Sequence, residues 1–267
     1  MTLLSCDGQS QTEIDFNLRF TPETIYSQTV ERTSTNEIQY AGSVEFLNSL
    51  TEQGINNPTV TEDRSIMESI IITDKETQGK ISLAMEFVKT GNEWLPDGTL
   101  LYGYCVQENG GMPVLDSVES EGMDIESRQM LLKSLQSTFE QFDLPHRRIK
   151  TGDSFSHESP LSIPVADVSV DMNVSTKYEL IEIRNDTADF EVTQTYTMTS
   201  TFDQLPVSAT GNGDGRMYYL ISKNFYSMYR MDITMEMGME VTGIILDMKT
   251  TSGFIQKNKI ERKRASR

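Results

Sequence analysis

Side chains that carry enzyme chemistry are scarce in this 267-residue chain. It has two His and two Cys, and neither His146 nor His157 lies in a motif that would place an imidazole beside a nucleophile. Zinc sites need clustered Cys and His, and the sequence has no such spacing. We therefore predict a protein that is not an enzyme and that uses no cofactor and no metal.

The glycine-rich run at Gly211–Gly215 is the segment most similar to a phosphate or calcium loop. Phosphate loops lead into a helix, whereas this run leads into a strand pattern that starts at Met217, and Asp214 would repel an anion. Asn212 and Asp214 are not followed by the Glu that a calcium loop requires. We therefore interpret the run as a plain hairpin loop.

The chain is strongly acidic, with 40 Asp and Glu against 23 Lys and Arg and a formal net charge of −17. Such a chain repels phosphate backbones, so we predict that it binds no nucleic acid. Basic residues concentrate only in residues 257–267. We predict that this segment is a basic tail, which is either a frayed end or an end attracted to the acidic body or to anionic lipid headgroups.

Methionine is unusually frequent, with 15 Met against 11 Phe. Between Met231 and Thr242, Met and other apolar residues alternate with acids, Thr and Gly, which is the pattern of a strand with one dry and one wet face. A row of flexible, polarizable Met side chains suits an irregular apolar ligand, and it equally suits a loosely specified core. The candidate ligand-binding residues on this apolar face are Met235, Met237, Met239, Phe190, Tyr196 and Met198.

Alternation of apolar and polar residues runs through most of the chain and predicts antiparallel strands. One long helix is predicted over 124–143, with Asp124 as its N-cap, an apolar stripe that includes Leu131 and Phe139, and a stop before Pro145. Strands are predicted over 14–20, 26–40, 66–72, 81–87, 99–107, 114–118, 168–180, 188–198, 217–220 and 226–243 and from 244 onward, and a short helix over 43–50.

Strands that are long, adjacent and amphipathic form a curved meander, which must close, stack or be covered. The helix over 124–143 is the available cover. We therefore predict an α+β fold, mostly antiparallel β, in which long curved half-barrel-like sheets wrap around this helix. Residues 13–256 then form a single β-rich domain, with the possibility of two loose halves, 13–120 and 150–256, joined by the helix.

The amino terminus contains a pattern that is typical of lipid attachment. Leu3-Leu4-Ser5-Cys6 has the form of a lipobox, and residues 7–12 are small and polar, so we predict a lipidation site at Cys6 and a flexible tether over residues 1–12. No basic and apolar signal segment precedes Cys6. Either Met1 lies inside a longer precursor with an upstream signal peptide, which we favour, or Met1 is the true start and the protein is cytoplasmic with an incidental Cys.

Six segments of the second half are distinctive. They are Gly152-Asp153-Ser154-Phe155, Pro160-Leu161-Ser162-Ile163-Pro164, Lys177-Tyr178-Glu179-Leu180-Ile181-Glu182-Ile183, Tyr196-Thr197-Met198, the glycine-rich loop before Met217-Tyr218-Tyr219 and the Met-alternating strand from Met231. Together they resemble a family of uncharacterised bacterial envelope lipoproteins, classed as a domain of unknown function. The resemblance implies export, lipid attachment at Cys6 and a place on the periplasmic face of the envelope, at the outer membrane more than the inner, but no activity. The expected shape also resembles, as a fold alone, the half-barrel carriers of the LolA and LppX kind.

Two functions are therefore expected. The first is a non-catalytic envelope lipoprotein that binds an apolar molecule such as a lipid in the half-barrel. The alternative is a structural or interaction lipoprotein with a fully packed core and an acidic partner-binding surface. The two differ in whether the inner face holds a ligand-sized cavity, which we expect to be lined by Met235, Met237, Phe190 and Tyr196.

Overall fold

The computed structural model describes residues 12–91, 95–106, 111–140, 142–165, 168–199 and 207–263. Cys6 and the expected tether before residue 12 lie outside the described residues. The elements in chain order are β1 (Glu13–Phe16), β2 (Thr24–Ala41), α1 (Val44–Glu52), β3 (Thr59–Thr73), β4 (Lys80–Lys89), β5 (Leu100–Val106), β6 (Pro113–Glu119), α2 (Ile125–Glu140), β7 (Arg147–Lys150), β8 (Ser154–Val165), β9 (Val168–Arg184), β10 (Thr187–Met198), β11 (Val207–Leu220), the 3-10 turn η2 (Ile221–Lys223), β12 (Phe225–Val241) and β13 (Ile244–Arg262).

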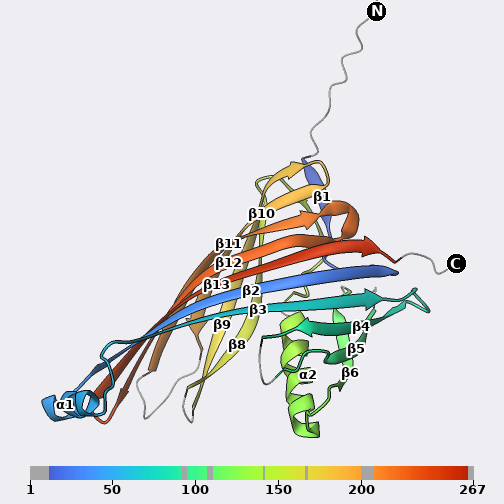
Figure 1. The fold of residues 1–267 in the computed structure, drawn as a ribbon. Coiled ribbons are helices and arrows are strands. Elements are labelled where there is room, and N and C mark those ends of the chain that lie inside the picture. Colours follow the sequence, from blue (N-terminus) through green and yellow to red (C-terminus); the bar gives the residue numbers. More distant parts are fainter. Residues whose placement is uncertain are drawn as a thin grey trace, which may run out of the picture.

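Within the described residues, eleven antiparallel strands form one large curved sheet in the order β6-β5-β4-β3-β2-β13-β12-β11-β10-β9-β8. The sheet stays open because its two edge strands, β6 and β8, do not pair with each other. Figure 1 shows the long central strands running past α2 toward α1 at their far end. The predicted α+β fold, mostly antiparallel and half-barrel-like, is confirmed.

One pairing joins segments from the two ends of the chain. β2 and β13 run antiparallel to each other from Thr24 opposite Arg262 to Ala41 opposite Ile245. Every other pair of neighbours in the large sheet is consecutive in sequence. The two expected halves are therefore adjacent parts of one continuous sheet.

The basic segment 257–267 is part of the sheet as far as Arg262, which corrects the prediction of a tail that starts at residue 257. β13 continues to Arg262 because β2 offers a row of backbone partners over the whole distance. The cations on its wet face lie beside acids, and Lys257 Nζ is 3.1 Å from Glu31 Oε1. Alternation does not reveal this stretch in the sequence because two of its inward-facing residues, Gln256 and Asn258, are polar although buried.

The glycine-rich run is also a strand, which corrects the prediction of a hairpin loop. Gly211, Gly213 and Gly215 belong to β11 and pair with both β10 and β12. A Cβ atom at Gly215 would overlap the Arg230 carbonyl oxygen and the Met231 sulfur. Glycine is therefore required at position 215 because the Arg230 backbone and the Met231 side chain of β12 occupy the space that a Cβ atom would need.

The amino-terminal segment packs on the inner face of the sheet and only its first part is a strand. β1 pairs with β7 in a separate two-stranded sheet, and the predicted alternation then continues outside any regular strand to Phe20. The Phe16 ring lies 5.3 Å from the Phe190 ring and 4.9 Å from the Tyr219 ring, measured between centroids. The apolar residues Ile14, Phe16, Leu18 and Phe20 are all at most 2% exposed.

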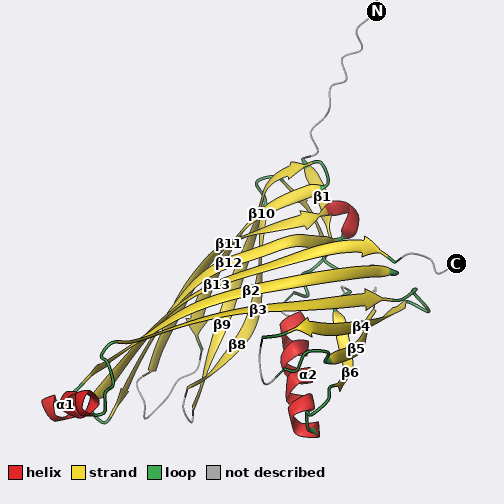
Figure 2. Ribbon diagram, in the orientation of Figure 1, coloured by secondary structure: helices red, strands yellow, loops and turns green. Residues whose placement is uncertain are grey.

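Both helices begin directly after the N-cap residues that the sequence predicts. Asp124 Oδ1 accepts a hydrogen bond from the Ser127 backbone N–H at 2.7 Å, so the predicted N-cap of α2 is confirmed. Leu131 of α2 is buried, and the rest of its apolar stripe packs partly buried against the main core. The short helix α1 is likewise confirmed, because Ser43 Oγ accepts from the Phe46 N–H at 3.2 Å. Figure 2 shows that α2 lies beside the short strands β4 to β6 and that α1 lies at the far tip.

Both open edges of the sheet are protected against pairing with another chain. Gln136 of α2 lies over β6, where its Oε1 accepts from the Leu115 N–H at 2.8 Å and its Nε2 donates to the Pro113 carbonyl at 3.3 Å. The other edge, β8, contains Pro160 and Pro164, which have no N–H to offer. Covered or proline-bearing edges allow a sheet to remain open without aggregating.

The close packing over β11 predicts a sharp difference between two glycine variants. Gly215→Ala should lower the free energy of unfolding by about 1–3 kcal/mol, as overpacking of a core does. Gly238→Ala is the matched control, because its Cβ would meet only the ends of the Ser208 and Asp247 side chains, at 3.1 and 3.3 Å. Urea unfolding of both variants measures the difference, and equal effects would contradict this account of the glycine run.

Candidate functional site

The predicted apolar face is divided between the main core and a second, smaller cluster. The smaller one, which we call the Met cluster, contains Tyr196 and Met237 as buried members, with Met198 and Met235 partly buried against it. These four predicted residues are therefore brought together. Its buried members are Val170, Met172, Val174, Tyr196, Ala209 and Met237.

The other two predicted residues lie elsewhere. Phe190 is fully buried in the main core, where its ring contacts that of Phe16. Met239 lies farther along β12, opposite Val207 and Leu246, and is partly buried. Alternation placed all six side chains on the same face of the sheet, but it did not show how far apart they lie along its strands.

An apolar cavity of about 150 Å³ lies between α2 and the inner face of the sheet. None of the six predicted residues lines it. Its volume is close to that of an engineered apolar cavity that holds benzene. We call it the helix cavity, and its lining residues are Leu18, Phe20, Gln28, Val30, Met67, Met85, Phe87, Met112, Leu135, Thr138, Phe139, Phe142, Phe225, Tyr226, Phe254 and Gln256.

Two of the polar side chains that line the helix cavity, Gln28 and Gln256, are hydrogen-bonded to neighbouring side chains. Ser69 Oγ donates to Gln28 Oε1 at 3.3 Å, across β2 and β3. Gln256 Nε2 lies 3.4 Å from Asn258 Oδ1, and Asn258 Nδ2 donates to the Tyr226 carbonyl at 3.1 Å. All four polar side chains are buried and uncharged. These pairings reduce the cost of placing polar atoms beside an apolar space.

A second cavity of about 140 Å³ lies nearer the Met cluster and is more polar. Tyr196 OH donates to Gln194 Oε1 at 2.8 Å, and Gln194 Nε2 donates to Thr176 Oγ1 at 3.1 Å. Of the predicted residues, only Tyr196 lines it. We call it the amide cavity, and its lining residues are Phe142, Ser159, Leu161, Val174, Thr176, Tyr178, Gln194, Tyr196 and Tyr229.

Phe142 lines both cavities. Its ring is stacked on Tyr226, with centroids 6.1 Å apart and planes inclined by 27°. It also meets Tyr229 edge-on, at 5.7 Å and 85°. Tyr226 lines the helix cavity and Tyr229 lines the amide cavity. The Phe142 ring therefore stands at the boundary between the two spaces.

The tyrosine hydroxyls around the cavities are held in their neutral form. Burial raises the pKa of Tyr196 to about 12. Burial likewise raises the pKa values of Tyr178, Tyr226 and Tyr229 above the ordinary value of 10.0. Neither cavity is lined by a charged side chain among the described residues. The pair of cavities therefore suits an uncharged ligand or an uncharged part of one.

Groups that could do chemistry lie away from these cavities. Cys105 is fully buried, and burial raises the pKa of its thiol to about 12, which makes it a poor nucleophile. His146 is exposed and pairs with Asp15. The part of the chain that the structure describes contains no group of three or more His, Cys, Asp and Glu side chains that could hold a metal ion.

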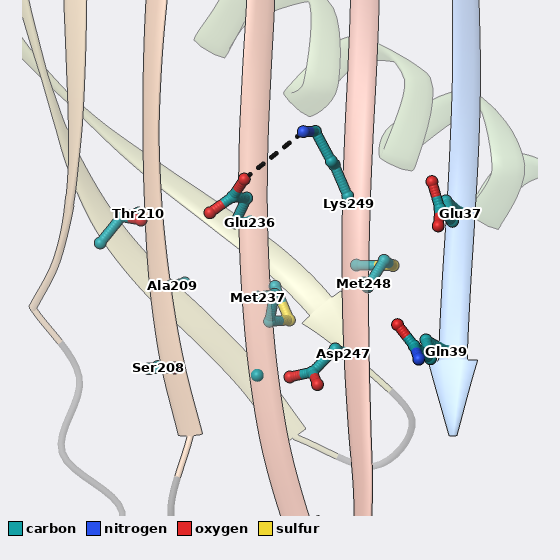
Figure 3. Close-up of a pocket in the computed structure, with 11 residues that line it drawn as sticks. Glu37, Gln39, Ser208, Ala209, Thr210, Glu236, Met237, Asp247, Met248 and Lys249 are labelled. Carbon is teal, nitrogen blue, oxygen red and sulfur yellow. Dashed lines mark ion pairs between the residues drawn. The ribbon is translucent and has the colours of Figure 1, made fainter. Parts of the chain in front are cut away.

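The opposite, outer face of the sheet carries a hollow of about 390 Å³ where Gly238 has no side chain (Figure 3). Glu236 of β12 and Lys249 of β13 are an ion pair at its rim, with 3.7 Å between Oε1 and Nζ. Glu37 and Asp247 add two further carboxylates, so acids outnumber cations at this hollow. We call it the acidic hollow.

No protein-family model matches the chain, and no curated protein matches it. In the described residues, none of the helices has both the length and the apolar composition needed to cross a membrane. The site is therefore interpreted from its own geometry.

The buried Cys105 thiol predicts a loss of stability at high pH. Its pKa is 9.0 ordinarily and about 12 in the folded chain, so between these values the unfolded chain binds fewer protons and stability falls as pH rises. The buried tyrosines act in the same direction. The free energy of unfolding of Cys105→Ala should therefore decline less steeply between pH 9 and 12 than that of the wild type. Urea unfolding at each pH measures both declines. Equal slopes in both proteins would contradict this assignment.

Proposed function

We propose that this chain is a non-catalytic envelope lipoprotein that holds an apolar ligand, such as a lipid chain, on the inner face of its half-barrel. In this proposal Cys6 carries the lipid anchor and the folded domain faces the periplasm, at the outer membrane more than the inner. The observation that carries the proposal is the helix cavity. This cavity is apolar and lies between the sheet and α2, the longer of the two α-helices among the described elements.

The walls of the helix cavity support the binding of a flexible chain. Met67, Met85 and Met112 line it, and flexible Met side chains can adapt their shape to an irregular apolar chain. About six methylene groups fill a space that holds benzene. At about 0.8 kcal/mol per buried methylene they contribute about 5 kcal/mol, which corresponds to a Kd of about 0.2 mM. Tighter binding requires contacts beyond this cavity.

Further contacts are available along the inner face. The amide cavity lies on the other side of Phe142 from the helix cavity. Two of its lining residues connect it to the Met cluster: Tyr196 is a member of that cluster, and Leu161 packs against it. Met198, Met235 and Met248 are partly buried there rather than fully enclosed. The inner face therefore presents apolar side chains over a distance longer than either cavity.

Filling the helix cavity should weaken binding of an apolar probe. Val30→Phe adds volume on the β2 wall and should weaken binding of the neutral dye N-phenyl-1-naphthylamine to the delipidated full chain by at least about tenfold. Val60→Phe is the matched control, because Val60 is 55% exposed on the neighbouring strand β3 and does not line the cavity. Fluorescence titration measures both affinities. Equal affinities, or no binding by the wild type, would count against the proposal, and native mass spectrometry of the untreated protein tests for co-purified lipid.

The acidic hollow favours a second candidate function, a structural or interaction lipoprotein that presents an acidic surface to a partner. The hollow lies on the outer face, and Glu37, Glu236 and Asp247 from three neighbouring strands line it (Figure 3). A partner with a basic segment would complement this charge. Ala209, Met237 and Met248 of the Met cluster also line the hollow, so the exposed acids are the residues that test the second function separately.

Charge reversal tests the second function. Glu37→Lys combined with Glu236→Lys should abolish co-purification of any partner that the wild-type chain retains from envelope extracts, because attraction becomes repulsion. Glu240→Lys changes another exposed acid of β12 outside the hollow and should retain the partner. Quantitative mass spectrometry of the three eluates measures this. Retention by all three proteins would exclude the acidic hollow as the binding surface.

A further inference from the structure

Phe142 is the one residue that lines both inner cavities, and it shares their boundary with Tyr226 and Tyr229, whose ring centroids are 6.0 Å apart. Phe142 contacts Tyr226 on the helix-cavity side and Tyr229 on the amide-cavity side, with centroids 6.1 and 5.7 Å away. It follows the end of α2, whereas both tyrosines belong to β12. Of these three rings, only that of Phe142 lies on both spaces, so it is the side chain whose truncation enlarges both.

The two cavities differ in the chemistry that they offer. The helix cavity is lined mainly by aliphatic, Met and Phe side chains, which suit a hydrocarbon chain. The amide cavity presents the Gln194 amide with the Thr176 and Tyr196 hydroxyls, which are hydrogen-bonded to one another. An amide nitrogen has two N–H donors and a hydroxyl oxygen has two lone pairs, so this group can bind a hydroxyl or ester while keeping its internal bonds.

Neither cavity is large enough for an amphipathic ligand of ordinary size. Their volumes are about 150 and 140 Å³. Together they approach the ~300 Å³ at which pockets begin to enclose drug-sized molecules. A ligand that occupies both must pass the Phe142 ring. A charged head group would lose its hydration without meeting a counter-ion, since no cation lines either space among the described residues.

We propose that the two cavities are compartments of one site for a single-chain amphipathic molecule with an uncharged polar head, such as a medium-chain fatty alcohol. The alkyl chain lies in the helix cavity, the head group binds at Gln194 and Thr176 in the amide cavity, and the Phe142 ring separates the compartments until the ligand displaces it. This inference rests on the proposed function and specifies its ligand class and the residue that sets ligand length.

Chain-length dependence tests the role of Phe142. Binding of hexanol and decanol to the delipidated full chain is measured by displacement of N-phenyl-1-naphthylamine. Phe142→Ala should raise the affinity for decanol about tenfold and leave hexanol nearly unchanged, because only the longer ligand must pass the ring. Phe139→Ala is the control: Phe139 lines the helix cavity alone, so its loss should change both affinities by a similar factor. Phe142→Leu, which keeps an apolar side chain, should show the same selectivity to a smaller extent and serves if the alanine variant does not fold.

Head-group dependence tests the polar compartment. At pH 8, wild-type protein should bind decanol at least about tenfold more tightly than decanoate, and Gln194→Leu should remove most of this preference by weakening decanol. If Phe142→Ala and Phe139→Ala change both alcohols alike, or if Gln194→Leu leaves the preference intact, the single-site inference is overturned while wild-type binding still supports the proposed function. If the wild type binds neither alcohol nor the dye, both fail.

Discussion

The inner face of an open sheet is the constraint on which the rest of this structure depends. The eleven strands of the large sheet curve without closing, and they present an apolar face that no second large sheet covers within the described residues. Burial of such a face supplies most of the favourable free energy of folding. The cover comes from α2 and from the amino-terminal segment that carries Phe16 and Phe20, both of which pack into the main core. Without them the half-barrel would expose its core to water.

The cavities follow from the shape of that cover. A straight helix of sixteen residues and a short extended segment meet a strongly curved sheet along limited lines of contact, so large side chains must fill the remaining space. Phe142, Tyr226 and Tyr229 fill part of it with aromatic rings. Flexible Met side chains surround what is left. A core between a helix and a curved sheet is filled less uniformly than a core between two layers of matching shape. An apolar ligand in the remaining space would complete the packing.

Local patterns predicted much of this architecture. The caps at Ser43 and Asp124 and the alternation along β12 gave the right element types, because a cap and a strand period are properties of neighbouring residues. The candidate site was predicted less well. Tyr196 and Met237 do share a cluster, but Phe190 lies in the main core, and the helix cavity is lined by other residues. Alternation indicates which face a side chain occupies and carries no information about the opposing surface.

The amino-acid sequence by itself determined that the chain forms amphipathic antiparallel strands, that its acids lie on their wet faces and that one helix is available as cover. Only the tertiary structure decided that β2 pairs with β13, that the glycine run of β11 is a strand, and that an unfilled space remains beside Phe142. Strand alternation and caps depend on residues a few positions apart. Neighbouring strands and cavities depend on contacts between segments far apart in the chain, which are defined only once those segments have packed together.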